Sequence, residues 1–120
     1  MSKTNKNYDP AFKFGATTLG SYNVITVDTS GTTSVDVFGS NGAPIDSTIT
    51  AVYLISKDTT AGNITLDVGG STVATIAKGT TAGALVGASS LSNTTVSEDD
   101  AVTVVSSSAG DATVMIHFTA

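Results

Sequence analysis

The chain has 120 residues and a formal net charge of −5, and it contains no Cys, Trp, Arg or Gln. This length fits a single domain, and the absence of Cys excludes disulfides, thiolate nucleophiles and Cys-ligated zinc. After residue 13 only two lysines oppose nine acidic residues. That balance argues against nucleic-acid binding by this part of the chain, because phosphate contacts need clustered Lys or Arg.

Residues 1–18 are predicted to form an extended N-terminal arm. Its distinctive side chains are three lysines and three aromatic residues: Lys3, Lys6, Lys13, Tyr8, Phe12 and Phe14. So polar a segment buries too little apolar surface to order alone, and we expect it to become ordered against another surface. Residues 1–9 lack the apolar region of a secretory signal. No apolar run in the chain approaches the ~20 residues of a membrane span, so no membrane is expected as a partner.

Residues 19–120 are predicted to form one all-β domain. Thr and Val favour strands, Ser and Gly favour turns, and apolar residues alternate with polar ones between the turn clusters. About eight strands are expected, at Tyr22–Asp28, Thr33–Phe38, Thr48–Ser56, Asn63–Val68, Thr72–Ala77, Ala84–Ala88, Val102–Ser107 and Ala112–Thr119. In the last of these, Val114, Ile116 and Phe118 occupy alternate positions. One face is therefore expected to be core, and the other to meet water or a partner.

Gly69-Gly70 lies between two of these segments. A pair of glycines supplies the positive φ angles that a two-residue hairpin turn requires. The sequence therefore predicts a tight hairpin here.

One pattern of eight residues, I-x-K-x-T-T-A-G, occurs at residues 55–62 and again at residues 76–83. Each copy ends a predicted strand and enters a corner, so Lys57 and Lys78 are predicted to occupy equivalent positions on the rim of the domain. Two copies are too few for a solenoid. The alternative interpretation is a recurring corner in a β protein of biased composition.

The sequence holds no recognisable catalytic constellation. His117 is the only His and has no partner for nucleophilic catalysis, and no phosphate-binding glycine motif is present. The contiguous acidic residues 98–100 lack the alternating spacing of a calcium loop, so we expect a solvated turn there, with a cation site as the alternative. We predict a protein that is not an enzyme and that needs no cofactor or metal.

The runs Val73–Gly87 and Asp100–Val114, within residues 45–120, resemble the small β-sandwich domains of tailed-phage capsid decoration (cement) proteins and head or tail fibres. This resemblance implies a single, jelly-roll-like β-sandwich at residues 19–120, carried on the capsid surface of the virion after synthesis in the host cytoplasm. It also implies binding to the major capsid protein, as a homotrimer.

The same resemblance gives the candidate contact residues a role. The six lysine and aromatic side chains of the arm would anchor it to the capsid, and Lys57 and Lys78 would make rim contacts. The alternative is a receptor- or carbohydrate-binding module of a phage head or tail fibre. Such a module needs exposed aromatic or polar groups that converge in a cleft.

Overall fold

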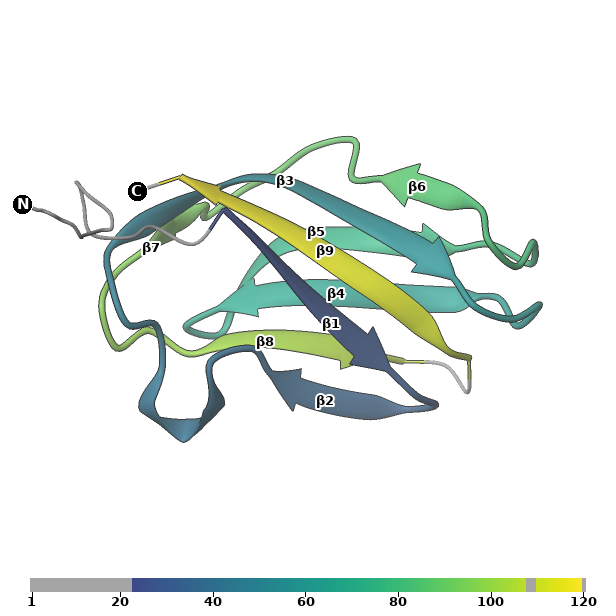
Figure 1. Ribbon diagram of the computed structural model, residues 1–120, viewed down its shortest axis with the longest axis horizontal. Helices are drawn as coiled ribbons and strands as arrows, with labels where there is room; N and C mark the ends of the chain where they lie inside the picture. Colours follow the sequence, from purple (N-terminus) through teal and green to yellow (C-terminus); the bar gives the residue numbers. More distant parts are fainter. Residues whose placement is uncertain (1–22, 108–109, 120) are drawn as a thin grey trace, which may run out of the picture.

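The computed structural model describes residues 23–107 and 110–119 (Figure 1); the predicted arm lies outside these ranges. The described residues form nine strands and one turn of 3-10 helix, η1 (Gly39–Asn41). The strands are β1 (Val24–Thr29), β2 (Thr33–Asp36), β3 (Ser47–Ser56), β4 (Gly62–Val68), β5 (Ser71–Lys78), β6 (Leu85–Gly87), β7 (Thr95–Val96), β8 (Val102–Ser106) and β9 (Ala112–Thr119). No helix in these ranges has the length and apolar composition to cross a membrane.

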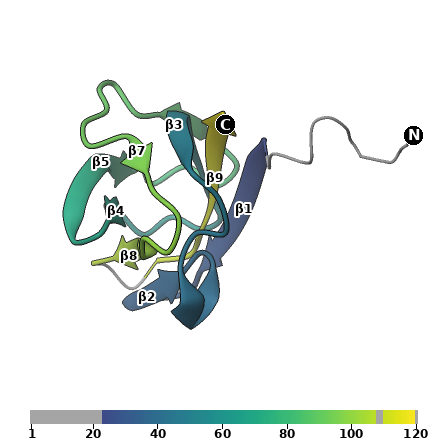
Figure 2. The same ribbon diagram turned by 90° about the vertical axis from the view of Figure 1, so that its left-hand side faces the viewer.

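The strands form two antiparallel sheets that pack face to face, as the end view in Figure 2 shows. Sheet A has the order β1-β9-β3-β6, with β7 also paired to β3, and sheet B has the order β2-β8-β4-β5. The pairs are nested: β4 with β5, β3 with β6 and β7, β2 with β8, and β1 with β9. The chain is thus one long hairpin rolled into two layers, which is the jelly-roll arrangement. The predicted jelly-roll-like β-sandwich is confirmed.

The tip of this long hairpin is the predicted glycine turn. Gly69 and Gly70 have φ values of 58° and 85°, and Val68 pairs with Ser71 across them. Positive φ at both central residues defines the type I′ turn that matches the twist of the flanking strands. The strongest local prediction therefore falls at the centre of the nested topology.

Each of the eight predicted segments overlaps a strand of the structure, with bounds that differ by a few residues, and among the described residues only the two-residue β7 was missed. A strand of two residues has no alternation to detect. The register of β3 against β9 shifts between Ile49 and Ala51, so the inward positions of β3 change from odd to even numbers. This bulge affects which side chains of β3 reach the core.

The core lies between the sheets and is almost entirely aliphatic. The large apolar side chains that the strands bury are Val27, Ile49, Val52, Leu54, Ile64, Leu66, Val68, Val73, Ile76, Val96, Val102, Val104, Val114, Ile116 and Phe118. Burial of one such side chain contributes about 1.5–3 kcal/mol. The rings of Phe38 and Phe118, with centroids 5.9 Å apart, add aromatic packing at the end of the sandwich where β1 begins.

The two ends of the sandwich differ in charge. The end where β1 begins, called the acidic end here, carries Asp36, Asp46, Asp67, Glu98, Asp99 and Asp100 on or beside its loops. The opposite end carries Asp28, Asp58, Asp111, Lys57 and Lys78. Both lysines of the described residues therefore lie at the opposite end, and no lysine of the described residues lies at the acidic end.

Candidate functional site

Within residues 23–107 and 110–119, no three His, Asp or Glu side chains come together as a metal site. His117 lies on the outer face of sheet A, where its ring and the Tyr53 ring make an edge-type contact with their centroids 5.3 Å apart and their planes at 70°. This contact gives His117 a packing role.

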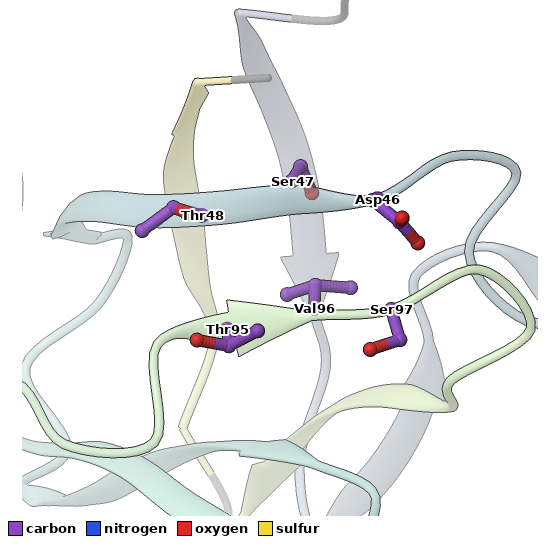
Figure 3. A pocket seen from close by; sticks show the side chains of 6 residues that line it. All are labelled: Asp46, Ser47, Thr48, Thr95, Val96 and Ser97. Atoms are coloured by element: carbon purple, nitrogen blue, oxygen red, sulfur yellow. The ribbon is translucent and has the colours of Figure 1, made fainter.

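A small, open pocket of about 250 Å³ lies at the acidic end, between the start of β3 and β7 (Figure 3). Its lining residues are Asp46, Ser47, Thr48, Thr95, Val96 and Ser97. Asp46 Oδ1 accepts a hydrogen bond of 2.8 Å from the Glu98 backbone N–H, so this carboxylate already has a partner. The pocket is smaller than the ~300–1,000 Å³ of typical ligand sites, and beside the Asp46 carboxylate its lining contains hydroxyls but no imidazole, amine or aromatic ring.

The acidic residues 98–100 form a turn, as the sequence predicts. Glu98 and Asp99 are exposed turn residues, and the Asp100 N–H donates to the Ser97 carbonyl at 3.0 Å. Asp100 Oδ2 accepts from the Ser97 N–H at 2.9 Å. The Asp100 carboxylate therefore closes the turn.

The two lysines of the repeated pattern lie in different environments. The side chain of Lys57 is 48% exposed and that of Lys78 is 0% exposed. On β3 the inward residues next to the corner are Leu54 and Ser56, so Lys57 points to solvent. On β5 the inward residues next to the corner are Ile76 and Lys78, so Lys78 points into the domain. The prediction that both lysines occupy equivalent rim positions is wrong, and Lys78 is not available for a rim contact; Lys57 remains a candidate.

Lys78 forms a buried ion pair with Asp58, which lies in the corner between β3 and β4. Its Nζ lies 2.5 Å from Asp58 Oδ1 and also donates to the Thr60 carbonyl. Asp58 further accepts from the backbone N–H groups of Thr60, at 3.0 Å, and Asp111, at 2.8 Å. The hydrogen bond from Lys78, followed by those from Asp111 and Thr60, lowers the pKa of Asp58 from 3.8 to about 2. The Asp58 carboxylate therefore stays charged at neutral pH.

Gly110 completes the enclosure of this ion pair. It is buried, and a Cβ placed on it would lie 2.5 Å from Lys78 Nζ and 3.1 Å from the Thr60 carbonyl oxygen. An ammonium held between a carboxylate and a carbonyl is neither a nucleophile nor a proton acceptor. The pair instead ties the corner after β3 to the end of β5 and to the β8–β9 connection.

The outer face of sheet A exposes a group of apolar side chains. We call it the sheet A patch, and its side chains are Val24, Ala51, Tyr53, Ile55, Leu85, Met115 and His117. Val24 is 48% exposed, Tyr53 36% and Leu85 60%. These are the exposed large hydrophobic residues of the described ranges, and all three lie on this one face.

Cross-strand pairing makes the patch continuous. Met115 of β9 pairs with Thr26 of β1 on one side and with Tyr53 of β3 on the other. Tyr53 pairs in turn with Gly87 of β6, and its ring lies so close that a Cβ on Gly87 would be 3.1 Å from Tyr53 Cε1. The missing side chain at Gly87 thus makes room for the Tyr53 ring. The row of paired residues runs across β1, β9, β3 and β6.

The outer face of sheet B is polar by comparison. Thr65 and Thr75 approach each other at 3.4 Å between their hydroxyl oxygens, and Thr103 donates to Asp36 Oδ1 at 3.5 Å. The half-buried Asp67 pairs with Thr103 on the same face. Of the two faces, sheet A is therefore the one suited to a protein partner, because contiguous exposed apolar surface marks interaction sites.

Of the sequence-predicted site residues, the structure describes only Lys57 and Lys78. The six side chains predicted as a capsid anchor lie outside the described residues. The patch was missed as a site, although the alternation in the segment Ala112–Thr119 indicated an outer face that could meet a partner. Apolar residues at its outward positions, such as Met115, were the available signal.

Comparison of the chain with protein-family models, with curated proteins and with solved structures gave no match.

Proposed function

We propose that this protein is a non-enzymatic decoration protein of a bacteriophage capsid, which binds the major capsid protein at the outer surface of the particle and stabilises it. The observation that carries this proposal is the sheet A patch, an apolar face on an otherwise polar and acidic domain. Such a face favours a binding or structural protein over one that acts on a small molecule.

The fold supports the proposal by analogy. Jelly rolls recur in viral capsid and lectin domains, although one fold can host many functions. In this proposal the protein is a homotrimer, residues 1–18 anchor it to the capsid, and Lys57 adds a rim contact. A module that binds glycans on a fibre ranks second, because the pocket at the acidic end has no aromatic ring to stack on a sugar.

The anchor is tested by co-sedimentation with undecorated capsids of the phage that encodes the chain. In the full-length protein, changing Tyr8, Phe12 and Phe14 to Ala should abolish most binding, because apolar burial dominates such a contact. Changing the three lysines of the arm to Ala should weaken binding less, because exposed ion pairs contribute only about 0–1 kcal/mol. Undiminished binding by the aromatic variant would contradict the anchor.

The homotrimer is tested separately by sedimentation equilibrium at micromolar concentration. We expect a mass of three chains in solution or on the particle. A strictly monomeric protein in both settings would contradict this part of the proposal.

A further inference from the structure

We propose that residues 1–22 fold back on their own body and cover the sheet A patch in the free protein, with Phe12 and Phe14 packed against Tyr53 and Met115. The inference goes beyond the capsid proposal, because it concerns the protein in solution and holds whether or not the protein decorates a particle.

The first argument is where the segment joins the body. The Asn23 carbonyl accepts a hydrogen bond of 2.7 Å from the Phe118 N–H, so residue 23 is fixed against β9 at the edge of sheet A. The next residue, Val24, points onto the outer face and pairs with His117, a member of the patch. Residues 1–22 therefore enter the body at the border of the patch.

The second argument is reach. Phe14 precedes Asn23 by nine residues, which span up to ~30 Å when extended. The four neighbouring strands β1, β9, β3 and β6 of sheet A are crossed in about 15 Å, because neighbouring strands are ~4.8 Å apart. Both phenylalanines can therefore reach any part of the patch.

The third argument is complementary chemistry. The patch is mostly apolar, and residues 1–22 contain four aromatic side chains, Tyr8, Phe12, Phe14 and Tyr22, that gain from leaving water. This segment carries three lysines, and it joins the body at the acidic end, where Asp46 and Glu98 are exposed. Opposite charges there favour a segment that stays close to the body.

The fourth argument selects the chain's own segment over a second copy. A segment tethered nine residues from its binding face has an effective concentration on the order of millimolar. A second copy of the chain competes at its bulk concentration, which is micromolar in most experiments. The tethered segment therefore covers the face first.

The test uses the two methionines of the chain, Met1 and Met115. In full-length protein with ¹³C-labelled methionine methyl groups and no capsid present, the Met115 signal should show the ring-current shift of a neighbouring phenylalanine. Changing Phe12 and Phe14 together to Ala should move it, and changing Thr17 and Thr18 together to Ala, as the matched control, should leave it in place. A Met115 signal that is identical in all three proteins would overturn the proposal.

A disulfide trap identifies which chain supplies the segment. The chain has no Cys, so Ala11→Cys can be combined with Thr26→Cys on the outer face of sheet A, or with Thr75→Cys on sheet B as control. Oxidation at low micromolar concentration should give an intramolecular disulfide with Thr26→Cys only. Disulfide-linked dimers would assign the segment to a second copy and overturn the proposal, as would equal trapping by both pairs. Because no capsid is present, failed capsid binding alongside a positive trap would count against the decoration function alone.

Discussion

The two copies of the I-x-K-x-T-T-A-G pattern fold into two different corners. In residues 55–62, which connect β3 to β4, Ile55 and Lys57 face outward. In residues 76–83, which connect β5 to β6, Ile76 and Lys78 face the core. In both copies Ile and Lys are two residues apart, so they lie on the same face of the strand. This spacing does not decide which face of the strand is inside.

The bulge in β3 explains the difference. Before the register shift Ser47 and Ile49 point inward, and after it Val52 and Leu54 do. Without the extra residue, the odd-numbered Ile55 and Lys57 would have faced the core like their counterparts in the second copy. The bulge lies between Ile49 and Ala51, a few residues before the first copy of the pattern. It thus decides whether the lysine of that copy is buried.

The largest expected contrast is between the two isoleucines. Ile76→Ala should lower the free energy of unfolding by about 2–5 kcal/mol, because it leaves a cavity in the core. Ile55→Ala, the matched control on the outer face, should cost no more than about 1 kcal/mol. Urea denaturation of both variants measures this contrast, and equal losses would show that the two copies are packed alike.

The lysines give the next contrast. Lys78→Ala should cost about 2–3 kcal/mol, below the usual 3–5 kcal/mol for breaking a fully buried pair, because Asp58 remains 34% exposed and can be hydrated. Lys57→Ala should change stability by no more than about 0.5 kcal/mol. The same urea titrations compare the two lysine variants. An unchanged free energy of unfolding in Lys78→Ala would contradict the structural role of the ion pair.

Gly110 sharpens this result through a double-mutant cycle. Gly110→Ala should destabilise the protein, because its Cβ would meet Lys78 Nζ at 2.5 Å. The loss should be smaller when Lys78 is already Ala, since the ammonium is then gone. Additive losses would mean that Gly110 is needed for its backbone alone.

The smallest expected effect is a pH dependence of stability. Only the first copy of the pattern can show it, because the second copy has Gly79 at the position that Asp58 occupies in the first. The pKa of Asp58 in the folded protein, about 2, is below its ordinary value of 3.8. Its contribution is therefore complete above about pH 4 and is lost as the pH falls from about 4 to about 2. Asp58→Asn should remove this part of the acid destabilisation in thermal melts between pH 5 and 2, and an unchanged slope would contradict it.

The sequence by itself determined the class of fold and most of the strands. Alternation of apolar residues located eight strands, because a strand with one face in the core must repeat every two residues. The glycine pair at residues 69 and 70 determined the central hairpin, because positive φ at two successive residues is disfavoured for other residue types. Turn chemistry and alternation are local, so a single sequence carries them.

Only the tertiary structure decided which of two similar lysines is buried and which outer face is apolar. Lys78 is buried because Asp58, Thr60 and Gly110 meet around it, and these residues lie on segments far apart in the chain. The sheet A patch exists because β1, β9, β3 and β6 lie side by side, which joins single outward residues such as Tyr53 into one surface. Pairing between distant strands has no local signal in the sequence, so these features appear only once the hairpin is rolled into two sheets.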